Sequence, residues 1–277
     1  MKAAFTLTPA ESKRLIAKAV VQMDEVKQAR ERGYIILCGG TTNGFVAQEL
    51  LGLDVPPQTF TAGINMRGVL CATNVEDRYQ PWPIILRRGE VVNIDMKQAF
   101  EDFHIETVVI KGANAVDPEW NVGVITSGFE GGTVAQFIGY VSSTGLKVIV
   151  PVGLEKLVAS VKDSATHAGA KTLDYSMGAN FGMYCLTNVK VVSEIQALKT
   201  LANVEAKHVA SGGVGGSEGS VVLVVKGSDD AVRRAISIVE AIKGEKPVPA
   251  LKGTCKTCPY SCKFQGMEEE NLPAFLR

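Results

Sequence analysis

Residues 33–45 read Gly-Tyr-Ile-Ile-Leu-Cys-Gly-Gly-Thr-Thr-Asn-Gly-Phe, an apolar run that leads into a glycine-rich turn. The run at 34–38 is apolar throughout, which is typical of a strand buried on both faces of a parallel sheet. Residues 39–44 predict a turn, and residues 45–51 predict a helix. A buried strand that passes through a turn into a helix is the repeating unit of an α/β sheet, so this stretch decides the fold class.

The segments around this stretch continue the same alternation. Thr8, Pro9 and Glu11 predict a helix start, because Thr8 can cap the helix, Pro9 suits its first position and Glu11 completes a capping box. Further strands and helices are predicted as follows: strands at 84–86, 107–110 and 147–152, a strand–turn–strand unit at 59–74, and helices at 97–103 and 131–142. The chain is therefore predicted to form an α/β fold with a parallel or mixed sheet flanked by helices.

A second, smaller unit is predicted after residue 187, where the composition changes. Its strands and helices alternate in an order typical of a ferredoxin-like α+β module: 189–192, 194–201, 205–209, 220–226 and a helix after Ser228. The glycine turn at 212–216 and the Val-rich strand that follows also resemble the shell-protein module of bacterial microcompartments. Pro247 and Pro249 mark a linker that is not helical. We divide the chain into an α/β domain, the α+β module, and a linker with a Cys-rich tail: 1–187, 188–246 and 247–277.

The composition limits the classes of partner. The 277 residues include 29 basic and 29 acidic side chains, so no net field favours nucleic acid or an anionic membrane. The first residues lack the apolar core of a signal peptide, and no apolar stretch reaches the length that spans a bilayer. We expect a cytoplasmic protein that binds neither nucleic acid nor membrane, and the sequence is compatible with a homo-oligomer.

The glycine-rich turn is a candidate anion site. Backbone N–H groups at the start of a helix lack partners and point at one spot, where the helix dipole favours negative charge. The candidate ligand-binding residues are Gly39, Gly40, Thr41, Thr42 and Asn43, because the glycines let the backbone approach closely and the threonines add hydroxyl donors. Phosphate or carboxylate is the predicted ligand; the alternative is a tight turn with no binding role.

Three segments together suggest a family. Residues 12–52, with a helix, Gly33, an apolar strand, the Gly-Gly-Thr-Thr-Asn turn and a helix, resemble the opening of ribose-5-phosphate isomerase. Its superfamily includes the glucosamine-phosphate deaminases and the coenzyme A transferases. Residues 108–125 resemble a second segment of these families, and residues 147–156, where a strand ends near a lysine, resemble a third. The resemblance covers the N-terminal two-thirds of the chain and implies that a ligand binds outside the carboxyl ends of the strands.

The resemblance also implies a second binding loop, after the strand at 107–110. Lys111, Gly112, Asn114 and Asp117 occupy this loop, and if its strand is parallel to the first, both loops face one crevice. Lys111 and Asn114 stand where the pentose-phosphate isomerases carry aspartates that bind sugar hydroxyls, so ordinary ribose-phosphate isomerisation is not implied. Lys111 can hold a phosphate or carboxylate; the alternative is a solvated lysine at a strand end.

Two further residues complete the candidate site. Glu130, between glycines at a helix start, is the nearest match to the family's catalytic carboxylate and could act as a base or nucleophile; alternatively it only stabilises the helix dipole. Arg67 lies in a polar loop that could close over the crevice. Lys111 and Glu130 are the catalytic candidates. The predicted activity is isomerisation by proton abstraction, or acyl transfer, on a phosphorylated or carboxylated metabolite; the alternative is a non-catalytic metabolite sensor or assembly module.

The C-terminal tail carries a metal-ligand motif. Residues 255–262 read Cys-Lys-Thr-Cys-Pro-Tyr-Ser-Cys, which places Cys255, Cys258 and Cys262 within eight residues. Thiolates this close can converge on zinc or an iron–sulfur cluster. Both centres usually take four protein ligands, so a fourth is expected from a histidine or from another cysteine: Cys38, Cys71 or Cys185. Alternatively, a cluster keeps an open site for substrate or for a fourth ligand that is not cysteine. The alternatives are a redox-active thiol pair and a reduced tail with no role.

Overall fold

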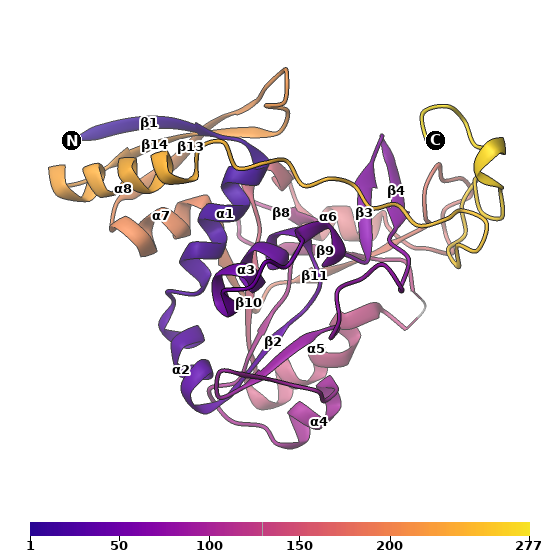
Figure 1. Ribbon diagram of the computed structural model, residues 1–277, viewed down its shortest axis with the longest axis horizontal. Helices are drawn as coiled ribbons and strands as arrows, with labels where there is room; N and C mark the ends of the chain where they lie inside the picture. Colours follow the sequence, from indigo (N-terminus) through magenta and orange to yellow (C-terminus); the bar gives the residue numbers. More distant parts are fainter. Residues whose placement is uncertain (129) are drawn as a thin grey trace.

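The computed structural model describes residues 1–128 and 130–277, and its centre is a six-stranded mixed sheet (Figure 1). The strand order is β12-β10-β7-β2-β5-β6, in which the first four strands are parallel and β5 and β6 are antiparallel at one edge. The bounds are β2 (Tyr34–Leu37), β5 (Ile84–Arg87), β6 (Glu90–Val92), β7 (Val108–Ile110), β10 (Lys147–Pro151) and β12 (Lys190–Val192). The predicted α/β fold is confirmed, and β2 and β7 are buried along their whole length, as their apolar sequences require.

Three smaller sheets surround the central one. They are the antiparallel sheet β1-β14-β13, the sheet β11-β9-β8 and the hairpin β3-β4. The bounds are β1 (Lys2–Leu7), β3 (Gly63–Met66), β4 (Val69–Ala72), β8 (Ala115–Val116), β9 (Val122–Thr126), β11 (Gly182–Leu186), β13 (Glu205–Gly212) and β14 (Ser220–Lys226). Figure 1 shows β1, β13 and β14 at one end of the molecule and the β3-β4 hairpin at the other.

Eight helices pack against these sheets in the described part of the chain. Their bounds are α1 (Pro9–Val20), α2 (Asp24–Arg32), α3 (Thr41–Leu51), α4 (Met96–Glu101), α5 (Gly132–Thr144), α6 (Val161–Thr166), α7 (Glu194–Ala202) and α8 (Asp229–Ile242). Short 3-10 turns lie at Pro57–Thr59, Leu154–Lys156 and Glu269–Asn271. Within residues 1–128 and 130–277, no helix has the length and apolar character needed to cross a membrane.

Helix α3 begins earlier than the predicted residue 45. Gly40 takes the position before the first helical residue with φ +150°, a conformation that favours glycine. Thr41 and Thr42 therefore form the first turn of the helix instead of a separate loop. Their backbone N–H groups therefore lie at the N-terminus of the helix, the position at which an anion is predicted to bind.

Local signals explain where α1 begins. Thr8 Oγ1 accepts a hydrogen bond from Glu11 N at 3.3 Å, and the Glu11 carboxylate accepts one from Thr8 N at 2.9 Å, which is the predicted capping box. The same carboxylate accepts hydrogen bonds from Lys243 Nζ at 2.8 Å and from Gly244 N at 3.0 Å. Glu11 therefore joins the start of α1 to the segment that follows α8.

The two predicted units share their sheets. Strand β12, from the 188–246 segment, pairs in parallel with β10 of the central sheet. Strand β1, from the N-terminus, pairs with β14 from Lys2↔Lys226 to Leu7↔Val221. Buried apolar side chains of both units belong to one continuous core that includes Leu7 and Ile242. Strand pairing and the apolar core are therefore continuous across the predicted boundary at residue 187.

The Cys-rich tail packs along the β3-β4 hairpin. Gly253 N donates a hydrogen bond to Ala72 O, at the end of β4, at 2.8 Å. A small second apolar cluster joins the tail to this strand and consists of Val69, Phe264, Leu272 and Leu276. The linker at 247–250 reaches this position by running from α8, at one end of the molecule, toward the hairpin at the other (Figure 1).

Candidate functional site

Three neighbouring parallel strands deliver the residues that follow them to one cavity. Strand β2 is followed by Gly39 and Gly40, β7 by Lys111 and Gly112, and β10 by the turn that carries Lys156. Because β2, β7 and β10 are adjacent and parallel, these residues meet at the same edge of the sheet. They line a cavity of about 680 Å³. The loops after β2 and β7 thus face one crevice, as the sequence predicts.

The two glycines after β2 are required for different reasons. A Cβ atom on Gly39 would lie 2.0 Å from Cη2 of Trp82, so the absence of a side chain there lets the Trp82 ring cover this residue. A Cβ atom on Gly40 would make only an ordinary contact, 3.6 Å from the Cα atom of Gly112 in the neighbouring loop. Gly40 is favoured instead by its φ of +150°, a conformation that residues with a side chain rarely adopt.

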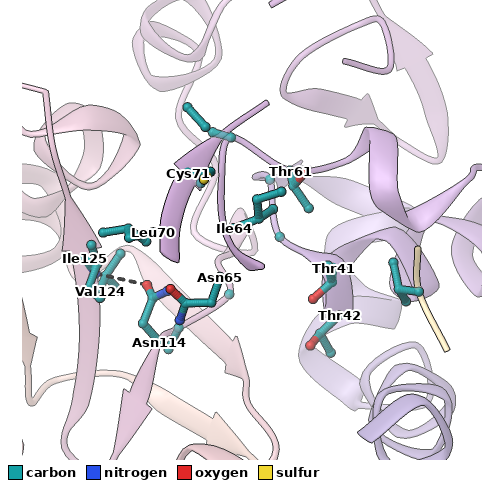
Figure 2. A pocket seen from close by; sticks show the side chains of 18 of the residues that line it. Thr41, Thr42, Thr61, Ile64, Asn65, Leu70, Cys71, Asn114, Val124 and Ile125 are labelled. Carbon is teal, nitrogen blue, oxygen red and sulfur yellow. Dashed lines mark hydrogen bonds between the residues drawn. The ribbon is translucent and has the colours of Figure 1, made fainter. Parts of the chain in front are cut away.

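Two helix N-termini also face the cavity. Thr41 and Thr42 begin α3, Gly132 and Thr133 begin α5, and all four line the cavity. The first N–H groups of a helix have no partner within it, and the helix dipole adds partial positive charge there. Figure 2 shows the Thr41 and Thr42 hydroxyls on the side of α3 that faces Asn114. This arrangement is suited to a phosphate or carboxylate.

Three lysines line the same cavity: Lys13, Lys111 and Lys156. Lys156 Nζ donates to Ala113 O at 2.8 Å, and Lys111 Nζ donates to Gly112 O at 3.1 Å, so both are held by main-chain carbonyls. Burial lowers the pKa of both side chains, that of Lys156 to about 8. Each is surrounded by protein atoms and yet keeps part of its surface open to the cavity. Near pH 8, Lys156 can therefore take up a proton when an anion binds.

A pair of carboxylates lies behind the lysines. Glu155 forms an ion pair with Lys13 at 3.1 Å, and the fully buried Glu194 accepts a hydrogen bond from Leu154 N at 3.0 Å. Burial, and then the charge of Glu155, raises the pKa of Glu194 to about 7. Burial also acts to raise the pKa of Glu155, but the charges of Lys13 and Lys156 lower it. Glu155 therefore pairs directly with Lys13, and its charge also raises the pKa of Lys156 against the larger effect of burial.

The opposite wall combines polar and apolar groups from the β3-β4 hairpin and β9. Asn65 and Asn114 lie beside each other on this wall, and Asn114 Oδ1 accepts a hydrogen bond from Ile125 N at 3.0 Å (Figure 2). Ile64 and Leu70 add apolar surface next to them. The wall can therefore bond the hydroxyl groups of a ligand and also contact its carbon skeleton.

Asn43 and Asp117, two of the predicted ligand-binding residues, lie outside the cavity lining. Asn43 is fully buried, and its Nδ2 donates to Cys38 O at 2.7 Å and to Ile110 O at 3.1 Å, which ties the ends of β2 and β7 together. Asp117 is also buried and accepts hydrogen bonds from the backbone and side-chain nitrogens of Asn121. Both side chains bond to the protein itself and hold in place the loops that do line the cavity.

Arg67 and Glu130 are also placed away from the lining. Arg67 lies at the tip of the β3-β4 hairpin and donates a hydrogen bond to the main-chain carbonyl of Arg277. Glu130 is exposed just before α5, whereas Gly128 and Gly131 beside it line the cavity. In the structure, the cavity lining thus takes in the predicted residues Gly39, Gly40, Thr41, Thr42, Lys111, Gly112 and Asn114.

The cavity also includes residues that the motifs do not indicate. Lys13 comes from α1, Trp82 from the loop before β5 and Tyr260 from the tail, and the linker at 247–250 lies along a further side. None of these follows a parallel strand, so the strand–turn–helix pattern carries no signal for them. Lys156 differs, because its place after the strand at 147–152 is visible in the sequence.

The tail cysteines lie near Cys71, while Cys38 directly follows β2 and Cys185 belongs to β11. All six cysteines are free thiols. Within residues 1–128 and 130–277, no three or more His, Cys, Asp or Glu side chains have an arrangement that would hold a metal ion without movement. The zinc or iron–sulfur centre stays a prediction.

Comparison with known proteins adds one distant similarity. No model of a known protein family matches the chain, and no curated protein matches it significantly. A solved structure of D-ribose-5-phosphate isomerase, in complex with phospho-erythronic acid, is similar over 82% of this chain and 84% of its own, with 17% sequence identity and a TM-score of 0.26. The two chains are only distantly similar, and the function proposed below rests on the cavity alone.

Proposed function

We propose that the cavity binds a small phosphorylated or carboxylated metabolite. The observation that supports this most directly is the charge of the lining: Lys13, Lys111 and Lys156 face the cavity, and among the described residues Glu218 is the one carboxylate that lines it. Ammonium groups that share a site repel one another, and an anionic ligand relieves that repulsion. The volume of about 680 Å³ falls within the roughly 300–1,000 Å³ of small-molecule sites.

The proposal extends to proton transfer on the bound metabolite. Burial lowers the pKa of Lys156 to about 8, so below this pH its ammonium binds the anion, and as the pH rises above 8 a neutral amine forms that can accept a proton from a carbon next to a carbonyl group. Lys111 and the first N–H groups of α3 can stabilise the negative charge that develops on the carbonyl oxygen. These roles fit isomerisation by proton abstraction.

Acyl transfer is the second activity of the predicted class, and it requires a nucleophilic carboxylate such as Glu130. Glu130→Gln tests whether Glu130 supplies the base or the nucleophile, because the amide keeps the size of the side chain and removes both functions. In the isomerase account the variant binds the metabolite and turns it over at the rate of the unaltered protein. Loss of turnover with unchanged binding would instead assign the chemistry to Glu130.

One observation favours a non-catalytic metabolite sensor as the second candidate. Glu218, the carboxylate that lines the cavity among the described residues, lies on the exposed turn between β13 and β14, whereas Lys111 and Lys156 follow the parallel strands β7 and β10. A sensor needs only the cationic lining and no second acid or base. Binding of an anion without turnover, under conditions in which the complex forms fully, would select this candidate.

Thermal unfolding with a panel of sugar phosphates, carboxylates and coenzyme A esters tests the proposal. A ligand at a hundred times its Kd stabilises the folded protein by about 2.7 kcal/mol, which raises Tm by roughly 5–10 °C for a chain of this size. Lys111→Met should lose this shift, and Lys199→Met, which removes an exposed lysine of α7, should keep it. The absence of any shift with every anion, or an equal shift in Lys111→Met, would rule the anion site out.

A further inference from the structure

The three tail cysteines meet a fourth thiol from a distant part of the chain. Cys71, Cys255, Cys258 and Cys262 together line a small cavity of about 30 Å³ between β4 and the tail. Hydrogen bonds fix the main chain on both sides of Cys71: Ala179 N donates to Leu70 O at 2.9 Å, and Gly253 N donates to Ala72 O at 2.8 Å. The fold therefore brings all four sulfur-bearing residues around one space.

We propose that Cys71, Cys255, Cys258 and Cys262 form a four-thiolate site for a thiophilic metal centre, either a zinc ion or a [4Fe–4S] cluster. Both centres are held by the same chemistry, four cysteine thiolates around one point, and Cys71 supplies the ligand that the tail motif lacks. Binding of zinc replaces four S–H bonds by four Zn–S bonds and releases four protons. A [4Fe–4S]²⁺ cluster forms in the same place from two ferrous ions, two ferric ions and four sulfide ions supplied in solution, and the four thiols again release their protons. Since the side chains do not enclose an ion without movement, the thiols must rotate about χ1 toward the common centre.

The other candidates for the fourth ligand lie elsewhere. Cys38 is fully buried at the end of β2 beside Lys111. Cys185 lies on β11 near Asp117 and Lys162. The three histidines of the sequence hydrogen-bond to groups outside the small cavity, and none of them lines it. Cys71 is therefore the cysteine outside the tail that the fold brings to the motif.

The surroundings of the four thiols suit a metal centre. The apolar cluster of Val69, Phe264, Leu272 and Leu276 adjoins them and limits access of water. Phe264 N–H points at Cys262 Sγ, with an N–S distance of 3.4 Å, and such bonds to sulfur tune thiolate-bound centres.

The site shares a wall with the large cavity. Leu70, Cys71, Ala72 and Ala179 line both cavities, and Tyr260, between Cys258 and Cys262, lines the large one. A metal centre would therefore hold one side of the large cavity in place. The metal proposal itself does not depend on the ligand proposed for that cavity.

Metal retention by the full chain, purified without oxygen, tests the assignment. The protein, Cys71→Ser and the control Cys185→Ser are each incubated with Zn²⁺ or with Fe²⁺, Fe³⁺ and sulfide, desalted, and analysed for zinc, iron and sulfide. Cys71→Ser removes a direct ligand, so it should weaken metal binding by more than the roughly 10–100-fold that follows loss of a group hydrogen-bonded to a ligand. The expected result is stoichiometric retention by the unaltered protein and Cys185→Ser and loss in Cys71→Ser. Zinc without iron identifies the ion, and equal amounts of iron and sulfide identify the cluster. Retention of the centre by Cys71→Ser, equal loss in Cys185→Ser, or no retention after either incubation would overturn the proposal.

Thiol alkylation of the unaltered protein tests the site without a variant, so it remains informative if Cys71→Ser does not fold. Mass spectrometry follows the modification of each cysteine with and without the metal that is retained. The proposal expects Cys71, Cys255, Cys258 and Cys262 to be protected together, while Cys185 reacts at the same rate in both states. Protection of the tail cysteines without Cys71 would contradict the four-thiolate site.

Discussion

The affinity of the large cavity for an anion is expected to fall as the pH rises through about 8. Burial shifts the pKa of Lys156 from its ordinary value of 10.5 to about 8. Below this pH the side chain is an ammonium that attracts the anion, and above it the neutral amine loses that attraction. A hydrogen bond to a charged group contributes about 1.5–3 kcal/mol, which corresponds to roughly a ten- to hundredfold change in Kd.

Lys156→Met tests this reasoning, because methionine keeps much of the side-chain length and removes the charge. At about pH 7 the variant should bind a phosphate ester roughly ten- to hundredfold more weakly than the unaltered protein, and at about pH 9.5 the two should bind nearly alike. Isothermal titration calorimetry at constant ionic strength measures both values. Burial also lowers the pKa of Lys111, so the variant keeps only the part of the pH dependence that belongs to Lys111.

The same experiment detects the proton directly. Near pH 8 about half of the Lys156 side chains are neutral, and a bound anion favours the ammonium, so the complex should take up about half a proton. Titrations in two buffers with different ionisation enthalpies give the number of protons. The reasoning is refuted if the unaltered protein binds with the same affinity from about pH 7 to 9.5, or if Lys156→Met shows the same uptake and slope.

Three further changes test the protein around the site. Glu194→Gln should stabilise the fold by about 1–3 kcal/mol at pH 8 and by much less at pH 5, because the raised pKa of Glu194 shows that its charged form is disfavoured in the folded state. Urea unfolding measures both values, and an equal difference at the two pH values would contradict this prediction. Gly39→Ala should lower the free energy of unfolding by about 1–3 kcal/mol, because the added Cβ clashes with Trp82. The control Gly139→Ala, exposed on α5 with no atom within 4 Å of its added Cβ, should raise the free energy of unfolding by about 0.5–1 kcal/mol. An equal loss of stability in both variants would contradict the close approach of Gly39 and Trp82. Asn43→Ala should cost about 1–3 kcal/mol in chemical denaturation, since it removes the side-chain donor from Cys38 O and leaves Ile110 O with Cys38 N alone; unchanged stability would remove its role as a tie between strands.

The central sheet and the start of α1 follow from local sequence. Strands β2 and β7 are apolar at every position because both of their faces are buried, and that pattern is visible in any window of a few residues. The capping box at Thr8 and Glu11 likewise depends on two residues three positions apart. The parallel order of β2 and β7 then places Lys111 next to the glycines, which is why this part of the cavity could be predicted.

The remaining features depend on segments that are distant in sequence. Strand β1 shows alternating burial, but nothing in residues 2–7 indicates that β14 is its partner. Asn43 and Thr42 are adjacent polar residues at the start of α3, yet only Thr42 lines the cavity, and the difference comes from the position of β7. Cys71 gives no local signal at all, because its role arises only when the tail packs on β4.

The location of a bound anion tests the central claim most directly. A crystal structure of the full chain with the anion that binds most tightly would show where its phosphate or carboxylate lies. We expect electron density for the anion within hydrogen-bonding distance of Lys111 Nζ and Lys156 Nζ. It should lie close to the first N–H groups of α3, at the carboxyl ends of β2, β7 and β10. Density for the anion at any other place, with the lysines still bonded only to the carbonyls of Gly112 and Ala113, would contradict it.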